Sequence, residues 1–193
     1  TVSSLGCASN LKASRSPVDP QLRKELTAMS KSDQDVRQAL IAAGMSRPSE
    51  ELIAKMIKID SANTERMKII LRIHGWPGKS MVGEEGETAA FLLVQHANRD
   101  PDFQKQALPL IREAYKVGET SGEHLALLTD RVLVSDGKMQ LYGSQAEIVD
   151  GKIIVKPIED ESNLNKRRAE LGLQPMDEYI ALMKKVYGLP QKP

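Results

Sequence analysis

Residues 87–97 read Glu87-Thr88-Ala89-Ala90-Phe91-Leu92-Leu93-Val94-Gln95-His96-Ala97, the most apolar helical run of this 193-residue chain. Apolar side chains occur on nearly all sides of this helix, so the pattern predicts a helix buried by its neighbours rather than one on the surface. We expect it to be the centre of the fold. His96 follows the run directly, where both nitrogens of its ring need partners.

The segments on either side of this run carry further helical patterns. Helices are predicted to start at Asp19-Pro20, near Ser49, at Asp100-Pro101, near Ser121, at Asn163 and at Pro175. We expect the first to be interrupted near residues 30–33, where Ser32 or Asp33 would cap a second segment, and to end at Gly44. Asp60 and Asn63 either cap a break in the second helix or point into a pocket.

The hydrophobic period changes after residue 137. Residues 139–142, 145–149 and 152–156 are short runs rich in β-forming residues, and Asp150-Gly151 is typical of a type I′ hairpin turn. The predicted fold class is therefore α+β, mostly α. It is a helical bundle around a buried central helix, with a small antiparallel β-meander or hairpin near residues 138–157.

Composition limits the organisation and the partners. The length suits one domain, which we expect over residues 19–188, with a leader at 1–18 and a tail at 189–193. Lys and Arg number 27 and Asp and Glu 26, so the net charge of +1 disfavours nucleic acid and anionic membranes as partners. No run reaches the roughly 20 apolar residues that span a bilayer.

The single cysteine, Cys7, follows Ser4-Leu5-Gly6 and precedes a polar stretch. The small residue before it resembles a bacterial lipoprotein cleavage site, and the first residue, Thr1, suggests a trimmed N-terminus. A lipid anchor at Cys7 would be the only membrane contact and would place the protein in the cell envelope. The alternative is a disordered tail with an incidental free cysteine, and a cytoplasmic location.

Two helices carry the polar residues that we single out first. His96 and Gln95 follow the apolar run, so at least one of them should face inward, either in a structural hydrogen-bond network or in a catalytic or ligand-binding role. His124, Leu128 and Arg131 share one helix face. An inward guanidinium needs a carboxylate, such as Asp130, Asp60 or Glu159, or else an anionic ligand.

Other candidates lie in loops. Trp76, in Gly75-Trp76-Pro77-Gly78, either covers the core or forms an apolar lid over a ligand. Tyr142 and Gln145 flank Gly143 and either reach a site at the sheet edge or hold a turn together. The acidic residues 159–161 and the basic residues 166–168 surround a helix start, which indicates a solvated cap.

Several familiar chemistries are absent from the sequence. It has no glycine-rich phosphate loop, no G-x-S-x-G elbow, no H-E-x-x-H and no paired-cysteine motif. His74, His96 and His124 lack the spacing of zinc ligands, so we expect neither a metal nor another cofactor.

An ordered set of motifs gives a resemblance to a known family. The set is Gly75-Trp76-Pro77, Val94-Gln95-His96-Ala97, Leu108-Pro109-Leu110, Asp130-Arg131, Tyr142-Gly143-Ser144-Gln145 and Asn165-Lys166-Arg167-Arg168 with Gly172-Leu173. Over Glu50 to Tyr187 the chain resembles an uncharacterised bacterial family, a domain of unknown function whose members are often exported or anchored. Ser144 stands where threonine is usual, and His74 and His124 also depart from the pattern. The resemblance implies a site of Trp76, Gln95, His96, Asp130, Arg131, Tyr142 and Gln145.

These observations lead to one hypothesis and one alternative. The hypothesis is a polar pocket in which His96, oriented by a carboxylate, is the acid-base group and Arg131 and Gln145 hold a small polar or anionic ligand, with hydrolytic or lyase-type chemistry. Asp130 is the second catalytic candidate. The alternative is a non-catalytic binding or structural interaction module in which the same residues form a buried polar network. A solvent-reachable cavity lined by His96 and Arg131 would favour the first.

Overall fold

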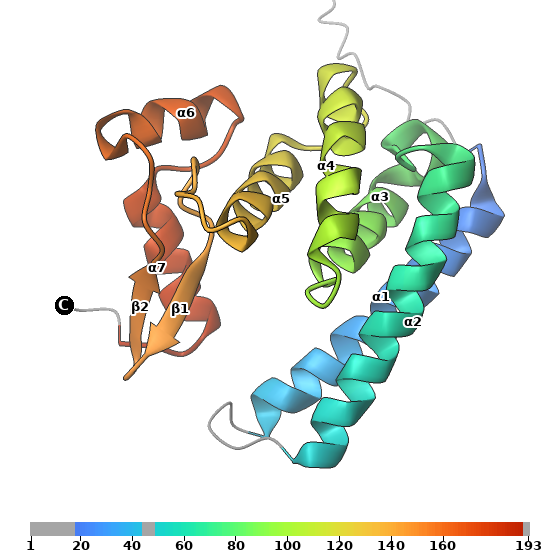
Figure 1. Cartoon of the computed structure of the whole chain (residues 1–193), viewed down its shortest axis with the longest axis horizontal. Helices are drawn as coiled ribbons and strands as arrows, with labels where there is room; N and C mark the ends of the chain where they lie inside the picture. Colours follow the sequence, from blue (N-terminus) through green and yellow to red (C-terminus); the bar gives the residue numbers. More distant parts are fainter. Residues whose placement is uncertain (1–17, 44–48, 191–193) are drawn as a thin grey trace, which may run out of the picture.

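The protein is described from a computed structural model, over residues 18–43 and 49–190. In this part of the chain seven α-helices accompany one two-stranded antiparallel sheet. The expected class, α+β and mostly α, is therefore confirmed. Figure 1 shows two long helices on one side, the β-hairpin with the last two helices on the other, and three helices between them.

The two long helices, α1 (Pro20–Ala42) and α2 (Glu50–His74), pack against each other. Each begins at a predicted cap: Asp19 Oδ1 accepts the Leu22 N–H at 2.8 Å, and Ser49 Oγ accepts the Leu52 N–H at 3.2 Å. Both helices are continuous. The interruption expected near residues 30–33 is therefore wrong, and the reading of Asp60 and Asn63 as caps of a helix break is excluded.

The polar residues at those two places bond in ways that leave each helix intact. Asp33 pairs with Arg37 one turn later, with 3.1 Å between Oδ1 and Nη2. In α2 the Thr64 hydroxyl donates to the Asp60 carbonyl at 2.8 Å, while the Asp60 carboxylate reaches across to Arg37. A carboxylate that is bonded to a guanidinium does not compete for backbone N–H groups, and the helix continues.

The central helix is α3 (Lys79–Gln95), which packs against α1 and α2 and contacts α4 and α5. Gly83 has φ 74° and ψ 170°, which kinks the element; a left-handed φ is accessible to glycine at little cost. From there the helix runs to Gln95, with His96 at its C-cap. Five apolar residues after the kink are no more than 3% exposed: Ala89, Ala90, Phe91, Leu93 and Val94. The prediction of a buried central helix is confirmed.

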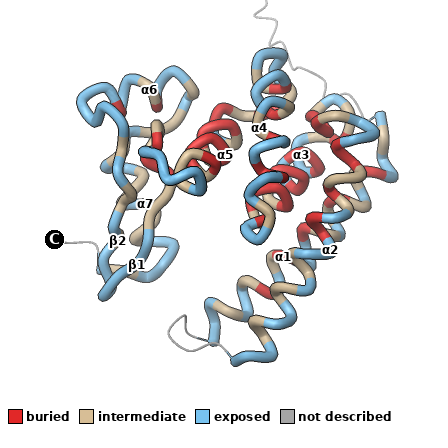
Figure 2. The backbone as a smooth tube through the Cα atoms, viewed as in Figure 1, coloured by how far each residue is buried: buried red, intermediate tan, exposed pale blue. Residues whose placement is uncertain are grey.

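Two further helices, α4 (Pro101–Lys116) and α5 (Gly122–Ser135), pack together on the other side of α3. Figure 2 shows buried residues concentrated on α3 and α5, whereas the far ends of α1 and α2 are largely exposed. The core therefore lies between the long helices and α5.

The C-terminal part holds β1 (Ala146–Val149) and β2 (Lys152–Val155), with Ile148 opposite Ile153. Asp150 and Gly151 both have positive φ, 49° and 71°, as a type I′ turn requires. Residues 139–142 form no third strand; Gln140 makes only an isolated parallel bridge to Ile158. A short 3₁₀ helix, η1 (Glu161–Asn163), then precedes α6 (Leu164–Glu170) and α7 (Met176–Val186).

Some expectations fall on residues outside the described ranges. Cys7 with the leader, Gly44 as a helix end, and residues 191–193 of the tail belong to this group. The lipid anchor and the envelope location remain predictions. Within the described ranges, none of the helices combines the length and the apolar character that a bilayer crossing needs.

Candidate functional site

A cavity of about 760 Å³ lies between α3, α5, the β-hairpin and α7. Four of the predicted site residues line it: Gln95, His96, Arg131 and Gln145. Its size is typical of pockets that hold small organic ligands. The structure thus brings the imidazole of His96 and the guanidinium of Arg131, from separate helices, to one hollow.

The His96 ring is held by a carboxylate from α1. Its Nδ1 lies 2.8 Å from Oδ2 of Asp33, whose side chain is 1% exposed, while the His96 side chain is 20% exposed. We assign the ring proton to Nδ1, donated to Asp33, because the carboxylate can only accept. Among the described residues Nε2 has no partner, so it is the ring atom left for a ligand or a water molecule.

Arg37, also on α1, connects this pair to α2. Its Nη2 donates to Asp60 Oδ1 at 2.7 Å, and its Nε lies 3.2 Å from Asp33 Oδ1 and 2.9 Å from His96 Nδ1. With the proton on Nδ1, Arg37 Nε donates to Asp33 rather than to the ring. The result is a half-buried cluster of Asp33, Arg37, Asp60 and His96.

The two carboxylates of this cluster differ in their electrostatics. Burial alone would raise the pKa of Asp33, but the hydrogen bond and charge of His96, together with Arg37, outweigh it and hold that pKa below its usual value. Burial raises the pKa of Asp60 above its usual value, because Arg37 opposes it only in part. Asp33 is therefore the firmly ionised partner of His96.

Arg131 is a half-buried cation without a carboxylate partner in the described part of the chain. With its amide oxygen turned toward Arg131, Gln95 accepts from Nε at 2.8 Å and from Nη2 at 3.1 Å, and Asn98 Oδ1 accepts from Nη1 at 2.7 Å. Burial, together with the charge of Arg37, lowers the pKa of Arg131. Of the partners expected for this guanidinium, neither Asp130 nor Asp60 nor Glu159 pairs with it.

Asp130 holds a loop in place. Its fully buried carboxylate accepts the N–H groups of Leu141 at 2.8 Å, Tyr142 at 3.0 Å and Ser144 at 2.9 Å. The carboxylate that contacts His96 is Asp33 instead. Asp130 does not line the cavity, so the structure does not support it as the second catalytic residue that the sequence suggested.

The loop that Asp130 holds forms one wall of the cavity. Gly143, with φ 71°, is packed so closely that a Cβ would lie 2.8 Å from Met176 Sδ. The Gln140 side chain forms two hydrogen bonds with the backbone of Gln145. Its Oε1 accepts the Gln145 N–H at 2.8 Å, and its Nε2 donates to the Gln145 carbonyl at 2.9 Å. Gln145 is thereby fixed at the cavity.

Tyr142 does not line this cavity. Its backbone N–H donates to Asp130 and its carbonyl accepts from Arg168, and burial raises the pKa of its hydroxyl. Arg168 is 1% exposed and lies 4.8 Å from the centre of the Tyr179 ring. The solvated cap expected for residues 166–168 is therefore wrong for Arg168, which fastens α6 to the loop.

Trp76 belongs to a second buried cluster. Its Nε1 donates at 3.3 Å to Glu87, which is fully buried on α3 and also accepts from the Thr120 hydroxyl. His124 Nδ1 lies 3.1 Å from the same carboxylate, and the His124 ring stacks on Phe91 at 4.0 Å between centroids. Because these groups bond one another inside the core, Trp76 acts as a core residue rather than as a lid on the cavity.

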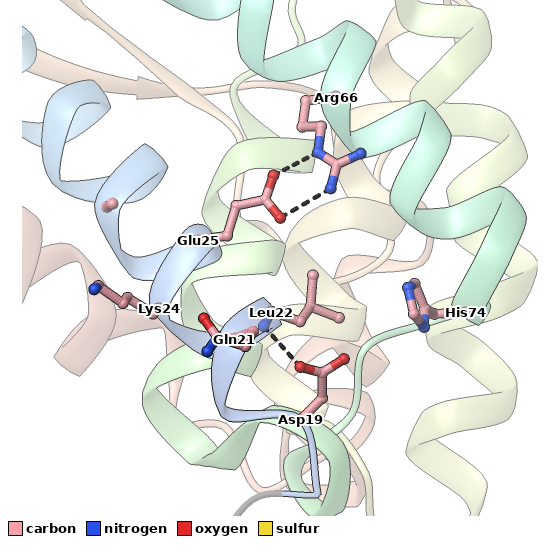
Figure 3. Close-up of a pocket in the computed structure, with 8 residues that line it drawn as sticks. Asp19, Gln21, Leu22, Lys24, Glu25, Arg66 and His74 are labelled. Carbon is pink, nitrogen blue, oxygen red and sulfur yellow. Dashed lines mark hydrogen bonds and ion pairs between the residues drawn. The ribbon is translucent and has the colours of Figure 1, made fainter.

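A further depression of about 550 Å³ lies between the start of α1 and the end of α2 (Figure 3). Glu25 and Arg66 form a two-armed ion pair there, which lowers the pKa of Glu25, and Asp19 caps α1. His74 lies apart from that pair (Figure 3). Its two best-placed charged groups, Glu25 and Arg66, already satisfy each other, so this depression is a poorer candidate for a binding site.

Two α1 residues of the site, Asp33 and Arg37, are not among the candidates that the sequence predicts. Their i, i+4 spacing is a signal of a helical ion pair. The stretch Ser30-Lys31-Ser32-Asp33 resembles a helix start, however, and so favours the interpretation of Asp33 as a cap. No group of three or more metal-binding side chains gathers within residues 18–43 and 49–190.

These features describe a helical α+β domain with a ligand-sized cavity, which is lined both by the histidine of an Asp-His pair and by a guanidinium that no carboxylate of the described ranges neutralises. Over residues 20–192 the chain matches the model of a family of unknown function, DUF6624, and it belongs to that family. No curated protein matches the chain, and no solved structure does.

Proposed function

We propose that this protein binds a small organic anion in the cavity between α3, α5, the hairpin and α7, with Arg131 as the anion-binding residue. The observation that carries the proposal is how the Arg131 guanidinium is paired: it lines the cavity and, among the described residues, bonds only the amide oxygens of Gln95 and Asn98. Gln145, fixed on the opposite wall, offers a second polar group to the ligand.

The energetics of a half-buried guanidinium favour this use. A cation removed from water loses hydration that neutral amides restore only in part. A carboxylate or phosphate oxygen would supply the missing charge through short charge-assisted hydrogen bonds, and the planar guanidinium suits both groups. Arg37 lies near enough to depress the pKa of Arg131, so an anion there would also relieve repulsion between two cations.

A second function, acid-base catalysis on the bound anion, is favoured by the Asp33–His96 pair. A carboxylate that accepts from Nδ1 fixes the imidazole so that Nε2 can take a proton from water. The activated water would attack the carbonyl carbon of an ester in the ligand, and Arg131 would stabilise the negative charge that develops on the carbonyl oxygen. The bond from that carbon to the alcohol oxygen would then break, and the protonated His96 would return its proton to the departing alcohol. The chain thus offers a base, an orienting carboxylate and a cation for hydrolysis.

The competing class is a structural module with a buried polar network. The cluster of Trp76, Glu87, Thr120 and His124 fits that description, because its groups bond one another within the core. His96 and Arg131 fit it less well. Both line a cavity, and His96 retains a ring nitrogen without a partner among the described residues.

Binding is tested by a thermal-shift and calorimetric screen of small carboxylates and phosphate esters against wild type and Arg131→Gln. The matched control is Arg72→Gln, which removes an exposed guanidinium from α2. We expect a ligand whose affinity falls at least tenfold in Arg131→Gln and is unchanged in Arg72→Gln. Equal affinity in the two variants, or the absence of any anionic ligand, would refute the proposal.

Catalysis is tested with nitrophenyl esters that carry a free carboxylate, using wild type, His96→Gln, Asp33→Asn and the exposed control His74→Gln. We expect His96→Gln to lower kcat by about 100-fold or more with KM little changed, and His74→Gln to have no effect. Hydrolysis that survives His96→Gln would exclude His96 as the base, while leaving the anion site standing.

A further inference from the structure

Exposed apolar side chains gather around the same cavity. In the described part of the chain eleven large hydrophobic residues are exposed, and five of them line this hollow. They are Ile148 and Val149 on β1, Leu182 and Val186 on α7, and Tyr187 just after it, each between 38% and 67% exposed. Isolated exposed hydrophobic residues are ordinary, but five around one opening require an explanation.

The polarity of the cavity changes from its buried side to its exposed side. Gln95 is 6% exposed, and the half-buried Arg131 bonds to it. At the opening, Ile148, Val149, Leu182 and Val186 are apolar and exposed. The one carboxylate that β1 adds to the lining, Glu147, is paired with Lys156. Figure 1 shows the hairpin and α7 on the same side of the molecule, beyond α5. A ligand lying from Arg131 to the opening would therefore meet a cation at one end and hydrocarbon at the other.

We infer that the ligand is an amphipathic monoanion, a carboxylate on an unbranched alkyl or acyl chain, whose head binds Arg131 and whose chain lies between β1 and α7. This inference rests on the anion site proposed above and specifies its ligand class. A volume of about 760 Å³ exceeds the space that a bare carboxylate or phosphate would fill. The apolar side chains at the opening would lose contact with water when the chain is bound, which is the main source of affinity for such a ligand.

The wall residues favour a chain rather than a flat aromatic ring system. Leu127, Ile153 and Met183 also line the cavity, and flexible aliphatic side chains adapt to an extended chain. The only described aromatic residues at the cavity are Phe91, Tyr179 and Tyr187. Phe91 is already stacked on His124, and the Tyr179 ring lies against Arg168.

The test is a homologous series of n-alkyl carboxylates, from acetate to decanoate, titrated as monomers into the full chain by calorimetry. Burial of one methylene contributes about fourfold in affinity, so we expect the Kd to fall by roughly that factor per methylene until the chain outgrows the cavity. Octanol, which has the same chain without the charge, should bind at least tenfold more weakly than octanoate.

Rim variants locate the chain. Leu182→Ser and Val149→Ser should weaken octanoate binding about fivefold to tenfold and leave acetate unchanged. Val117→Ser, which makes the same kind of change at an exposed residue after α4, should alter neither. If Leu182→Ser unfolds, Val149→Ser alone still tests the location.

The outcomes separate this inference from the proposed function. If acetate binds at Arg131 and longer chains gain nothing, the inference is overturned and the anion site stands. If octanol binds as tightly as octanoate, both are overturned. If no carboxylate binds, the inference is overturned, and the phosphate esters of the screen above decide whether the anion site stands. If the protein floats with phosphatidylglycerol vesicles yet binds no monomeric octanoate, the apolar residues form a membrane-contacting face and the inference is overturned.

Discussion

Arg37 lies between the carboxylates of Asp33 and Asp60, whose pKa values the fold shifts in opposite directions. Asp33 is buried and bonded to both Arg37 and His96, which holds its pKa below the usual value despite burial. Asp60 bonds Arg37 alone, and burial raises its pKa. At the scale of single residues, contact with the imidazole therefore decides which carboxylate is the stable anion of the site.

The first prediction compares Asp33→Asn with Asp60→Asn. A lowered folded-state pKa means that the Asp33 anion stabilises the fold above the ordinary aspartate pKa and that this contribution is lost as the pH falls through the lowered value. We expect Asp33→Asn to reduce the free energy of unfolding at pH 7 by about 3 kcal/mol, as for one partner of a buried ion pair. In urea unfolding between pH 2 and 7, the difference in the free energy of unfolding between wild type and Asp33→Asn should decrease only as the pH falls toward the lowered pKa of Asp33.

Asp60→Asn should behave differently. A raised folded-state pKa means that ionised Asp60 costs stability as the pH rises through that value. The neutral isostere avoids this cost but gives up the ion pair with Arg37, so we expect a change of less than about 1 kcal/mol at pH 7. Equal losses in the two variants at pH 7 would contradict the assignment of Asp33 as the principal anion.

The second prediction concerns the contribution of Arg131 to the free energy of unfolding in the absence of ligand. This cation is half-buried and has no carboxylate partner within residues 18–43 and 49–190. Arg131→Met should therefore change the free energy of unfolding by less than about 1 kcal/mol, because burial of an apolar methionine offsets the loss of the bonds to the amides. The same variant should lose anion binding. A destabilisation of several kcal/mol, measured by urea titration, would mean that Arg131 is a structural residue.

At the scale of elements, the sequence predicts what depends on local pattern. The α3 run and the Asp150-Gly151 turn are strong signals, because an all-apolar helix and a positive-φ pair each have few structural alternatives. The continuity of α1 cannot be predicted from local pattern. In the sequence Asp33 resembles a helix cap, and only the tertiary structure shows that its carboxylate pairs with His96, 63 residues away.

The site shows the same division between local and tertiary information. Arg131, Gln95, His96 and Gln145 could be singled out from pattern and resemblance, and the fold brings them to one cavity. The roles of Asp130 and Arg168 could not be predicted, because both bond backbone groups of a loop whose path the sequence does not specify. From sequence alone, a buried charged residue that binds backbone groups cannot be distinguished from a catalytic residue.

The third prediction tests the role of that loop. Asp130→Ala leaves three backbone N–H groups without their acceptor, so we expect the free energy of unfolding to fall by about 3 kcal/mol. Asp130→Asn keeps one acceptor oxygen and should fall between this variant and wild type. The matched control is Asp102→Ala, an exposed acidic residue on α4, which should change stability by less than about 0.5 kcal/mol.

At the scale of the whole molecule, the cavity separates two parts with different burial. On one side α3 and α5 belong to the core, with Val94 and Leu128 fully buried. On the other side α7 has no buried residue, and every residue of β1 and β2 is at least partly exposed. The C-terminal wall is fixed mainly through Asp130, Gln140 and Arg168.

The fourth prediction follows from this asymmetry. Local stability scales with buried apolar contact, so amides of α7 and the hairpin should exchange with deuterium at least tenfold faster than those of α3 and α5. Saturating octanoate should slow exchange in α7 and β1, because the chain would add the apolar contacts that this wall lacks, and it should leave the far ends of α1 and α2 unchanged. In Leu182→Ser that protection should be lost while exchange in α3 remains as in wild type. Uniform exchange across both walls without ligand would show that the polar anchors alone make the C-terminal part as stable as the core, and protection confined to α1 and α2 would place the bound anion elsewhere.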